Sequence, residues 1–416
     1  MSIIVQKFGG TSVATLERMK SVQKKVMAAR AKGYKVLVVL SAMAGETNRL
    51  LALANEWSAN PDPAETDVLV ATGEQCSIAL FAMLLKDSGV KARSLLAHQI
   101  PIYTDDSYGR ARIHGIESGT LENLFNHYDV LVAAGFQGKD HKGRITTLGR
   151  GGSDTSAVAL ASALGSVECE IYTDVEGVYT TDPNMCKDAR KISHISYDEM
   201  LEMASMGAKV LEIRSVEFAK KYDVPVHVRS TFSDNVGTLV TKENKIMEHV
   251  LVSSIAYDKD QARVTLRSVP DTPGVAAKIF SPLADAGIVV DMIVQNPSRD
   301  GVTDMTFTTP RKDIKKTIAI AEDICKKLGG NAELTYDLNV AKVSAIGVGM
   351  RNHSGVAAIA FAALQKENIN IMMISTSEIK ISILIEEKYI ELAVRTLHDM
   401  FIGTADKIVC DETNYN

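Results

Sequence analysis

Residues 7–12 (KFGGTS) combine the residue types that a nucleotide-phosphate site needs, directly after a short apolar run. Gly9 and Gly10 let backbone N–H groups approach an anion, because neither residue has a Cβ atom. The helix predicted to follow adds the partial positive charge of its N-terminus, and Lys7 adds a full charge. The spacing fits neither GxxxxGK[ST] nor GxGxxG, which argues against a P-loop and a dinucleotide fingerprint. The segment is therefore either a cradle for the β- and γ-phosphates of a nucleotide or a plain glycine turn.

Residues 146–156 (TTLGRGGSDTS) carry a second pair of glycines at the expected start of a helix, with Ser153 placed as its N-cap. Arg150 can hold a carboxylate or a phosphate through two parallel hydrogen bonds. Asp154 can hold a substrate ammonium group or position Lys7. The alternative is that Ser153 and Asp154 only cap the helix.

Residues 172–183 (YTDVEGVYTTDP) leave an apolar strand and form a polar loop with glycine and proline turns. Such a loop can cover the ribose and the base of a nucleotide. Taken alone, the same pattern is typical of a surface loop.

An alternation of strands and helices positions these segments. Apolar runs predict strands at 3–5, 35–40, 130–134 and 169–173, and helical spacing predicts helices at 16–27, 77–85 and 155–163. Strands separated by helices imply a mostly parallel sheet that is covered on both faces. Ligands on such sheets bind beyond the carboxyl ends of the strands, which is where both glycine pairs fall.

The C-terminal part contains an internal repeat. Residues 274–293 recur at 355–374, with nine identical positions at an offset of 81 residues. Each copy is predicted to follow the order strand, helix, strand, strand, helix, strand, which is the ferredoxin-like βαββαβ pattern. A repeat of this length indicates a duplicated module, because solenoid repeats are only 20–50 residues long.

Composition narrows the class of protein. The chain has 416 residues, 46 Lys and Arg against 51 Asp and Glu, and a formal charge of −5, which is a poor basis for binding nucleic acid. Its five cysteines are widely spaced and form no CxxC pair, which indicates free thiols in a reducing compartment and argues against a zinc site. We found neither a secretory signal nor an apolar run of the roughly 20 residues that span a bilayer. These features predict a cytoplasmic globular protein of two to three domains.

Taken together, the three glycine- and threonine-rich segments resemble the signatures of the amino-acid kinase family, and within it the aspartate kinases. Three further matches, at 39–43 (VLSAM), 72–75 (TGEQ) and 206–211 (MGAKVL), follow in the same order along the chain. The resemblance implies an α/β fold: a three-layer, mostly parallel sheet domain at 1–245, followed by two ferredoxin-like ACT regulatory modules at 246–337 and 338–416. It also implies ATP-dependent phosphorylation of the side-chain carboxylate of L-aspartate to 4-phospho-L-aspartate. This is the first step towards lysine, threonine, methionine and diaminopimelate.

The resemblance assigns roles to individual residues. Lys7 would stabilise the transferring phosphoryl group, Asp154 would orient that site and contact the substrate, and Arg150 would take the substrate α-carboxylate. Glu74 would pair with the substrate ammonium group. The remaining nucleotide-binding positions would be Phe8, Gly9, Gly10, Ser41, Thr173, Asp174, Tyr179, Asp182 and Lys209, and the remaining substrate-binding positions Thr47, Gly151, Gly152 and Ser153. Mg²⁺ would be carried on the ATP oxygens, since no dedicated carboxylate cage is visible and no protein metal site is predicted. Residues 212–214 (EIR) depart from the His-Pro-Arg that many relatives have after the lysine, which affects local backbone geometry.

The duplicated half resembles ACT modules, which sense amino acids. Residues 375–379 (STSEI) are similar to the subgroup that lysine and threonine inhibit together. The effector-binding residues implied by this resemblance are Asp271, Thr272, Gly274, Ala276, Asp291, Ile293 and Gln295 in the first copy and Asn370, Ile371, Ser377 and Glu378 in the second. The open edges of such modules usually pair, which predicts a homo-oligomer. Met247 lies where some relatives restart translation to make a shorter regulatory subunit, which would give an α2β2 assembly.

Two other functions stay open at this point. One is a related kinase that acts on glutamate, acetylglutamate, carbamate or a nucleoside monophosphate. The other is a catalytically dead amino-acid sensor, against which the presence of Lys7, Glu74, Arg150 and Asp154 argues.

Overall fold

The computed structural model describes residues 2–207, 210–243, 250–296, 301–329 and 332–403. These residues form two compact units. Unit 1 consists of the described residues within 1–179 and 191–248, and unit 2 of those within 180–190 and 249–416. The stretch 180–190, which the sequence places within the first domain, therefore belongs to unit 2.

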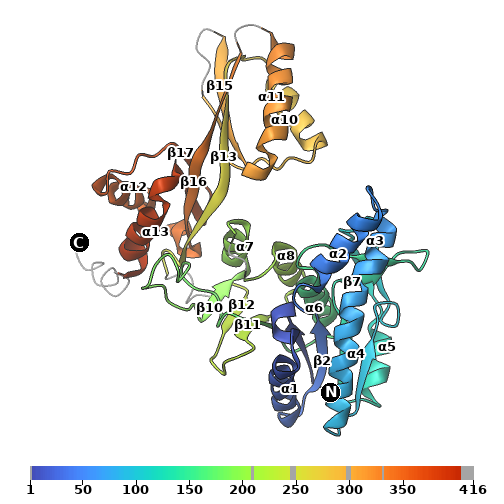
Figure 1. Ribbon diagram of the computed structural model, residues 1–416. Coiled ribbons are helices and arrows are strands. Elements are labelled where there is room, and N and C mark those ends of the chain that lie inside the picture. Colours follow the sequence, from blue (N-terminus) through green and yellow to red (C-terminus); the bar gives the residue numbers. More distant parts are fainter. Residues whose placement is uncertain (1, 208–209, 244–249, 297–300, 330–331, 404–416) are drawn as a thin grey trace. The chain divides into compact units, whose positions relative to one another are not determined.

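Among the described residues of unit 1, the main element is an eight-stranded sheet (Figure 1). Its strand order is β10 (His194–Ser196), β12 (Thr238–Thr241), β11 (Val226–Ser230), β9 (Cys169–Thr173), β1 (Ile3–Phe8), β2 (Lys35–Leu40), β6 (Val130–Ala134) and β3 (Ala92–Leu95). All neighbouring strands are parallel except β11 and β12. The predicted strands are confirmed, with β1 continuing to Phe8. The central strands are apolar almost throughout because helices cover both faces.

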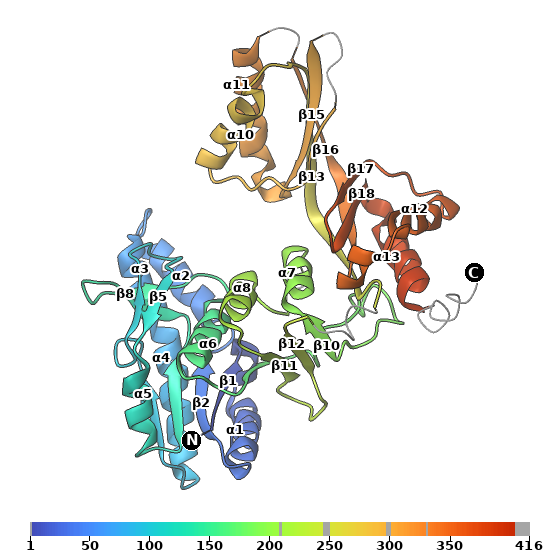
Figure 2. The same ribbon diagram turned by 180° about the vertical axis from the view of Figure 1, so that it is seen from behind.

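Helices from two parts of the chain form the outer layers of unit 1 (Figure 2). On one face, α1 (Leu16–Ala31) and α4 (Thr72–Asp87) bury apolar side chains against β1, β2 and β6. On the other face, α6 (Gly152–Ala163) contacts β1, β2 and β9 and packs against α8 (Ile213–Tyr222). The other helices among the described residues of unit 1 are α2 (Glu46–Trp57), α3 (Pro63–Val70), α5 (Ser118–Phe125), α7 (Tyr197–Ser205) and the 3-10 helix η1 (Gly10–Val13).

A small four-stranded sheet lies beside α3. Its order is β5 (Ile113–Ile116), β4 (Ile102–Thr104), β7 (Gln137–Lys139) and β8 (Ile145–Thr147). Strands β7 and β8 form a hairpin between the end of β6 and the start of α6. This hairpin therefore determines where the second pair of glycines lies.

Residues 63–87, which comprise α3 and α4, are long and apolar enough to cross a membrane by length and composition. Half of their most apolar 18-residue window is buried inside the protein, however. Ile78, Phe81 and Leu85 of α4 belong to the core beneath the main sheet. We therefore interpret this stretch as part of the core of unit 1.

Among the described residues of unit 2, a six-stranded antiparallel sheet carries two helix pairs. The strand order is β14 (Ile293–Gln295), β15 (Val302–Thr309), β13 (Ser254–Pro270), β16 (Glu333–Ile346), β18 (Lys380–Glu386) and β17 (Met373–Thr376). The helices are α10 (Val275–Asp285), α11 (Ile314–Leu328), α12 (Val356–Lys366) and α13 (Ile390–His398), with short helical turns η2 (Arg311–Asp313), η3 (Val348–Asn352), η4 (Glu387–Tyr389) and η5 (Asp399–Gly403). Each repeat supplies one helix pair and one edge of the sheet.

The two long strands β13 and β16 run through both halves of this sheet. The first half of β13 pairs with the second half of β16, with Ser254 opposite Ile346 and Asp258 opposite Lys342. Ile255 accordingly lies in the core formed by α12 and α13, although it precedes the first repeat. The two modules are therefore interleaved, because each long strand contributes to both. The limits 246–337 and 338–416 stay a prediction, and one boundary between them cannot describe this exchange of strands.

Segment 180–190 is fastened to unit 2 by hydrogen bonds. The Ile255 N–H donates to the Thr180 carbonyl at 2.7 Å, and the Tyr257 hydroxyl donates to Asp182 Oδ2 at 2.9 Å. The Arg395 Nε–H donates to the Met185 carbonyl at 3.1 Å. The loop predicted at 172–183 is thus divided between the two units after Tyr179.

Candidate active site

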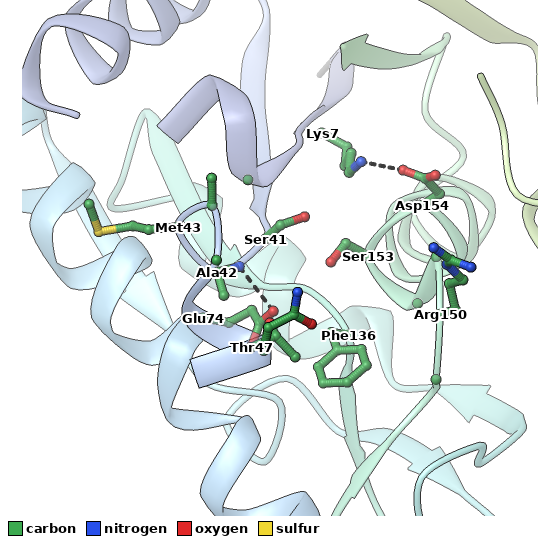
Figure 3. Close-up of a pocket in the computed structure, with 17 residues that line it drawn as sticks. Lys7, Ser41, Ala42, Met43, Thr47, Glu74, Phe136, Arg150, Ser153 and Asp154 are labelled. Carbon is green, nitrogen blue, oxygen red and sulfur yellow. Dashed lines mark hydrogen bonds and ion pairs between the residues drawn. The ribbon is translucent and has the colours of Figure 1, made fainter. Parts of the chain in front are cut away.

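A pocket of about 310 Å³ opens at the carboxyl ends of β1, β2 and β6 (Figure 3). Ten residues predicted from the sequence line it: Lys7, Gly10, Ser41, Thr47, Glu74, Arg150, Gly151, Gly152, Ser153 and Asp154. They come from six separate stretches of unit 1, which the sheet brings to one edge. Both pairs of glycines therefore reach the same side of the molecule.

Lys7 and Asp154 form an ion pair at one wall of the pocket (Figure 3). Lys7 is on β1, and its side chain leaves the sheet on the face opposite to Phe8 because successive side chains alternate. That face is covered by α6, whose first turn carries Asp154. The two side chains are only 11% and 12% exposed, so each would be costly to leave unpaired. Asp154 therefore holds the Lys7 ammonium group in place at the pocket wall.

The N-terminus of α6 lines the pocket with Gly151, Gly152 and Ser153. The N-cap is Gly151 and not Ser153 as expected, since Ser153 lies within α6; Gly151 has φ +66°, a left-handed conformation that glycine adopts without strain. A Cβ at Gly152 would lie 2.9 Å from side-chain atoms of both Leu148 and Phe136, so the close packing here also requires glycine. The helix dipole and the Lys7 charge together make this wall attractive to anions. Arg150, which precedes Gly151 and is exposed, adds a further positive charge.

The first pair of glycines packs against the loop that follows β2. The Ala44 N–H donates to the Gly10 carbonyl at 3.2 Å, and a Cβ at Gly10 would lie 2.7 Å from the Ala42 carbonyl oxygen. Such a contact is too short for any residue other than glycine. Gly10 is therefore needed for the close approach of these two loops, which form the opposite wall.

Glu74 is a buried carboxylate at the base of the pocket, only 3% exposed. Its Oε1 accepts a hydrogen bond from the Ala42 N–H at 3.0 Å, whereas its buried Oε2 has no hydrogen-bond partner among the described residues. Burial raises the pKa of Glu74 to about 7, against the opposing effect of the Ala42 hydrogen bond. An ammonium group placed against Oε2 would restore the ionised form, because a nearby positive charge favours it.

The other predicted nucleotide-binding residues lie outside this pocket lining. The Phe8 ring is in the core, stacked on Tyr172 with ring centroids 4.6 Å apart, so only its backbone can meet a ligand. Gly9, Thr173, Asp174 and Tyr179 are in unit 1 but do not line the pocket, and Asp182 is in unit 2. Lys209 lies outside the described residues.

Seven pocket residues were not predicted individually from the sequence: Ala42, Met43, Ala44, Gly45, Asn48, Phe136 and Gly149. The first four belong to the small-residue loop after the strand at 35–40, whose position at a carboxyl strand end was the available signal. Phe136 likewise follows the strand at 130–134, and its φ of +69° is unusual for a residue with a side chain. Nothing in the sequence distinguishes Asn48 from an ordinary polar helix residue.

Among the described residues, two clusters offer three possible metal ligands each, and neither is in the pocket. In the cluster of Glu168, Glu170 and His227, Glu170 accepts from Gln6 at 2.6 Å and from Arg229 at 2.7 Å. His227 pairs with Glu168 at 2.9 Å, so all three side chains already have protein partners. The second cluster, Cys186, His398 and Asp399, lies in unit 2, where His398 Nε2 and Thr180 Oγ1 are 2.9 Å apart.

The predicted effector residues lie at two opposite edges of the unit 2 sheet. Ile293 and Gln295 are on the edge strand β14, and the nearby Asp291 forms an ion pair with the buried Lys342. Ser377 and Glu378 follow the other edge strand, β17. The remaining predicted positions are Asp271, Thr272, Gly274 and Ala276 at the start of α10, and Asn370 and Ile371 before β17. Although β14 and β17 are opposite edges in the strand order, Met292 and Val294 at β14 pack in one apolar cluster with Met372 and Met373 at β17.

Comparisons with known proteins agree with this architecture. Residues 2–230 match the amino acid kinase family, and residues 264–327 and 343–401 each match the ACT domain. An aspartate kinase of Stutzerimonas stutzeri is 54% identical over 402 residues, which is 96% of this chain and 97% of that protein. An aspartokinase of Helicobacter pylori is 51% identical over 403 residues, covering 96% and 99%. The structure of Escherichia coli aspartokinase III in complex with aspartate and ADP superposes with a TM-score of 0.77 at 30% identity, covering 96% of this chain and 99% of that one.

Proposed function

Since this chain belongs to the amino acid kinase family, and within it to the aspartate kinases with two ACT domains, we propose that its pocket transfers the γ-phosphoryl group of ATP to the side-chain carboxylate of L-aspartate. The product would be 4-phospho-L-aspartate. The observation that carries the proposal is the pairing, in one pocket, of a cationic wall at Lys7 and the α6 N-terminus with the buried carboxylate of Glu74.

The chemistry requires little acid–base catalysis. The side-chain carboxylate of aspartate is ionised at neutral pH and is itself the nucleophile. A carboxylate oxygen forms a bond to the γ-phosphorus as the bond to the β,γ-bridging oxygen breaks, and ADP leaves with that electron pair. No proton needs to move, so the protein contributes charge neutralisation and alignment.

Each charged side chain of the pocket has one task in this proposal. Lys7, held by Asp154, stabilises the charge on the transferring phosphoryl group, and Asp154 also contacts the substrate. Arg150 binds the α-carboxylate, and Glu74 binds the ammonium group. The remaining contacts to the substrate come from Thr47, Gly151, Gly152 and Ser153.

The nucleotide would extend from the pocket towards residues 173–179 of unit 1. Gly9 and Gly10 would meet its phosphates together with the Phe8 backbone, Ser41 and Lys209. The ribose and base would lie near Thr173, Asp174 and Tyr179. Of the two pocket carboxylates, Asp154 pairs with Lys7, and Glu74 accepts from the Ala42 N–H and would bind the substrate ammonium group. Because neither carboxylate is left over as a metal ligand, we expect Mg²⁺ to be bound mainly by ATP oxygens. There the ion would neutralise phosphate charge.

The ACT half would make the enzyme responsive to its pathway products. Lysine and threonine would inhibit by binding one conformation better than another, at sites built from the residues beside β14 and β17. A lysine- and aspartate-bound structure of Escherichia coli aspartokinase III, with a TM-score of 0.75 at 30% identity, supports an effector role for lysine. Both sets of residues lie beside edge strands of the sheet, and edge strands are where a second copy of the chain could pair.

These edge strands support a homo-oligomer formed through the ACT half. An α2β2 assembly with a shorter subunit starting at Met247 is the further possibility raised by the sequence, and Met247 lies outside the described residues. The enzyme would act in the cytoplasm, consistent with the free thiols of Cys76, Cys169, Cys186 and Cys325. It would supply the first intermediate for lysine, threonine, methionine and diaminopimelate.

Hydroxylamine trapping of the acyl phosphate tests the proposal. Parallel reactions contain ATP, Mg²⁺ and either aspartate or glutamate. Hydroxamate formed with aspartate is the expected result. Product with glutamate alone would reassign the substrate, and product with neither would leave the chain as an amino-acid sensor.

A further inference from the structure

We propose that Asp67 and Arg214, which lie outside the pocket lining, are positioning residues. They hold residues 147–150, the turn that presents Arg150, from two sides and so set the affinity for aspartate. The inference rests on the proposed function, because it assumes that Arg150 and Glu74 bind the two ends of the substrate. Both residues belong to unit 1, and both form hydrogen bonds with backbone groups directly before the pocket residues Gly149 and Arg150.

Asp67, on α3, holds two loops with one buried carboxylate that is only 1% exposed as a residue. Its Oδ2 accepts from the Thr147 N–H at 2.7 Å, and its Oδ1 accepts from the Thr147 hydroxyl at 2.6 Å. Both oxygens also lie 3.0 Å from the Gly109 N–H. Burial raises the pKa of Asp67, and these hydrogen bonds act in the opposite direction. A buried carboxylate bound in this way has little freedom to move.

Arg214, near the start of α8, donates hydrogen bonds to carbonyl groups of the same two loops. Its Nη1 donates to the Leu148 carbonyl at 2.6 Å, and its Nη2 donates to the Ala111 carbonyl at 2.9 Å. Leu148 and Ala111 are fully buried, so these carbonyl groups would lose their partners without Arg214. A planar guanidinium with several donors suits such a two-point contact.

The two loops also contact each other between these side chains. The Ala111 N–H donates to the Thr147 carbonyl at 2.8 Å, and a Cβ at Gly149 would lie 2.9 Å from the Gly109 carbonyl. Gly149 has φ +79° and immediately precedes Arg150. The backbone that presents Arg150 is therefore fixed on one side by Asp67 and on the other by Arg214.

Asp67 links this turn to the other end of the proposed substrate site. It lies on α3, which continues with one intervening residue into α4, where Glu74 occupies the first turn. The carboxylate thus connects the helical run that carries Glu74 with the strand end that leads to Arg150. Because displacing a binding group by about 1 Å can cost roughly 10²-fold, loosening this connection should weaken aspartate binding.

Steady-state kinetics of the full-length protein tests the inference with Asp67→Asn, Arg214→Met, Arg214→Lys and their combinations. Asparagine keeps the shape of Asp67 but turns an N–H₂ group towards backbone donors, and lysine can reach only one of the two carbonyls. The matched controls are Glu65→Gln on α3 and Lys220→Met on α8, which remove exposed ion pairs with Arg144 and Asp198. Dissociation constants for aspartate and ADP are measured by calorimetry at a temperature where urea unfolding shows each variant to be fully folded, because partial unfolding would itself raise the apparent Kd.

We expect Asp67→Asn and Arg214→Met each to raise the KM and Kd for aspartate at least tenfold, with changes below about threefold for the nucleotide. Arg214→Lys should fall between Arg214→Met and the wild type. The double variant should lose less than the product of the two single effects, because residues acting on one turn are not additive.

Three outcomes would overturn the inference: unchanged aspartate affinity in both single variants, equal effects in the controls, or a double variant whose loss is fully multiplicative. If Asp67→Asn does not fold, Thr147→Val is used in its place. Thr147→Val removes only the hydrogen bond from the Thr147 hydroxyl to Asp67 and keeps the one from the Thr147 N–H. An active wild type with unaffected variants refutes only the positioning roles. A wild type that neither binds nor phosphorylates aspartate refutes the proposed function and this inference with it.

Discussion

Replacing Glu74 by glutamine should stabilise the free protein at alkaline pH while weakening aspartate binding. The folded protein binds a proton at Glu74 more tightly than the unfolded chain does, because burial raises this pKa from 4.5 to about 7. Wild-type stability is therefore lost progressively as the pH rises from about 4.5 to 7, by about 3 kcal/mol in total. Glutamine keeps the acceptor for the Ala42 N–H but does not ionise, so Glu74→Gln escapes this loss.

Urea unfolding at pH 5 and pH 8 measures the difference between the two proteins. The variant should gain up to about 3 kcal/mol over the wild type at pH 8 and much less at pH 5. In calorimetric titrations, the wild type should bind aspartate about tenfold more weakly for each pH unit below 7, because the ammonium group needs ionised Glu74. The variant should bind weakly at every pH. An equal stability difference at both pH values, or an unchanged aspartate affinity in Glu74→Gln, would refute this account of Glu74.

Three further predictions concern other parts of the molecule. Lys7→Ala should lower kcat by at least roughly 10²–10³-fold, and it should lower stability because Asp154 is left unpaired. Circular dichroism and calorimetry should still show a folded protein that binds effectors, and near-normal turnover would refute the role of Lys7. Gly10→Ala should cost about 1–3 kcal/mol of stability, because its Cβ would lie 2.7 Å from the Ala42 carbonyl, and an unchanged melting temperature would contradict this packing argument. Lysine and threonine together should inhibit more than the sum of their separate effects, and a two-effector titration that shows simple additivity would exclude concerted inhibition.

The fold class was predictable because the buried strands have a strong signal. Strands β2, β6 and β9 begin and end as predicted, since sheets covered on both faces select uninterrupted apolar runs. Helix boundaries were less accurate: α6 begins at Gly152 rather than Thr155 because the left-handed Gly151 caps it. Helix α4 begins at Thr72 because it continues from α3.

Long-range features of the molecule were not predictable from local patterns. The attachment of segment 180–190 to unit 2 depends on partners such as Ile255 and Arg395, which are distant in sequence. The interleaving of the ACT modules through β13 was missed because the repeat at an offset of 81 residues suggests two consecutive units.

Convergence in the pocket was the part of the candidate site that sequence could anticipate. Lys7, Arg150 and Asp154 flank glycine pairs at strand ends, so the parallel sheet predicted their common edge. The positioning residues Asp67 and Arg214 could not be predicted from the sequence. Both occur in helices without a recognisable motif, and both contact backbone groups of segments distant in sequence.

The most direct test of the central claim is a crystal structure of the protein with aspartate and a non-hydrolysable ATP analogue. It should show the substrate ammonium group at Glu74, the α-carboxylate at Arg150 and the terminal phosphate between Lys7 and the α6 N-terminus. The side-chain carboxylate should point at that phosphate in line with the bridging atom. Aspartate bound outside this pocket, or a terminal phosphate remote from Lys7, would contradict the account.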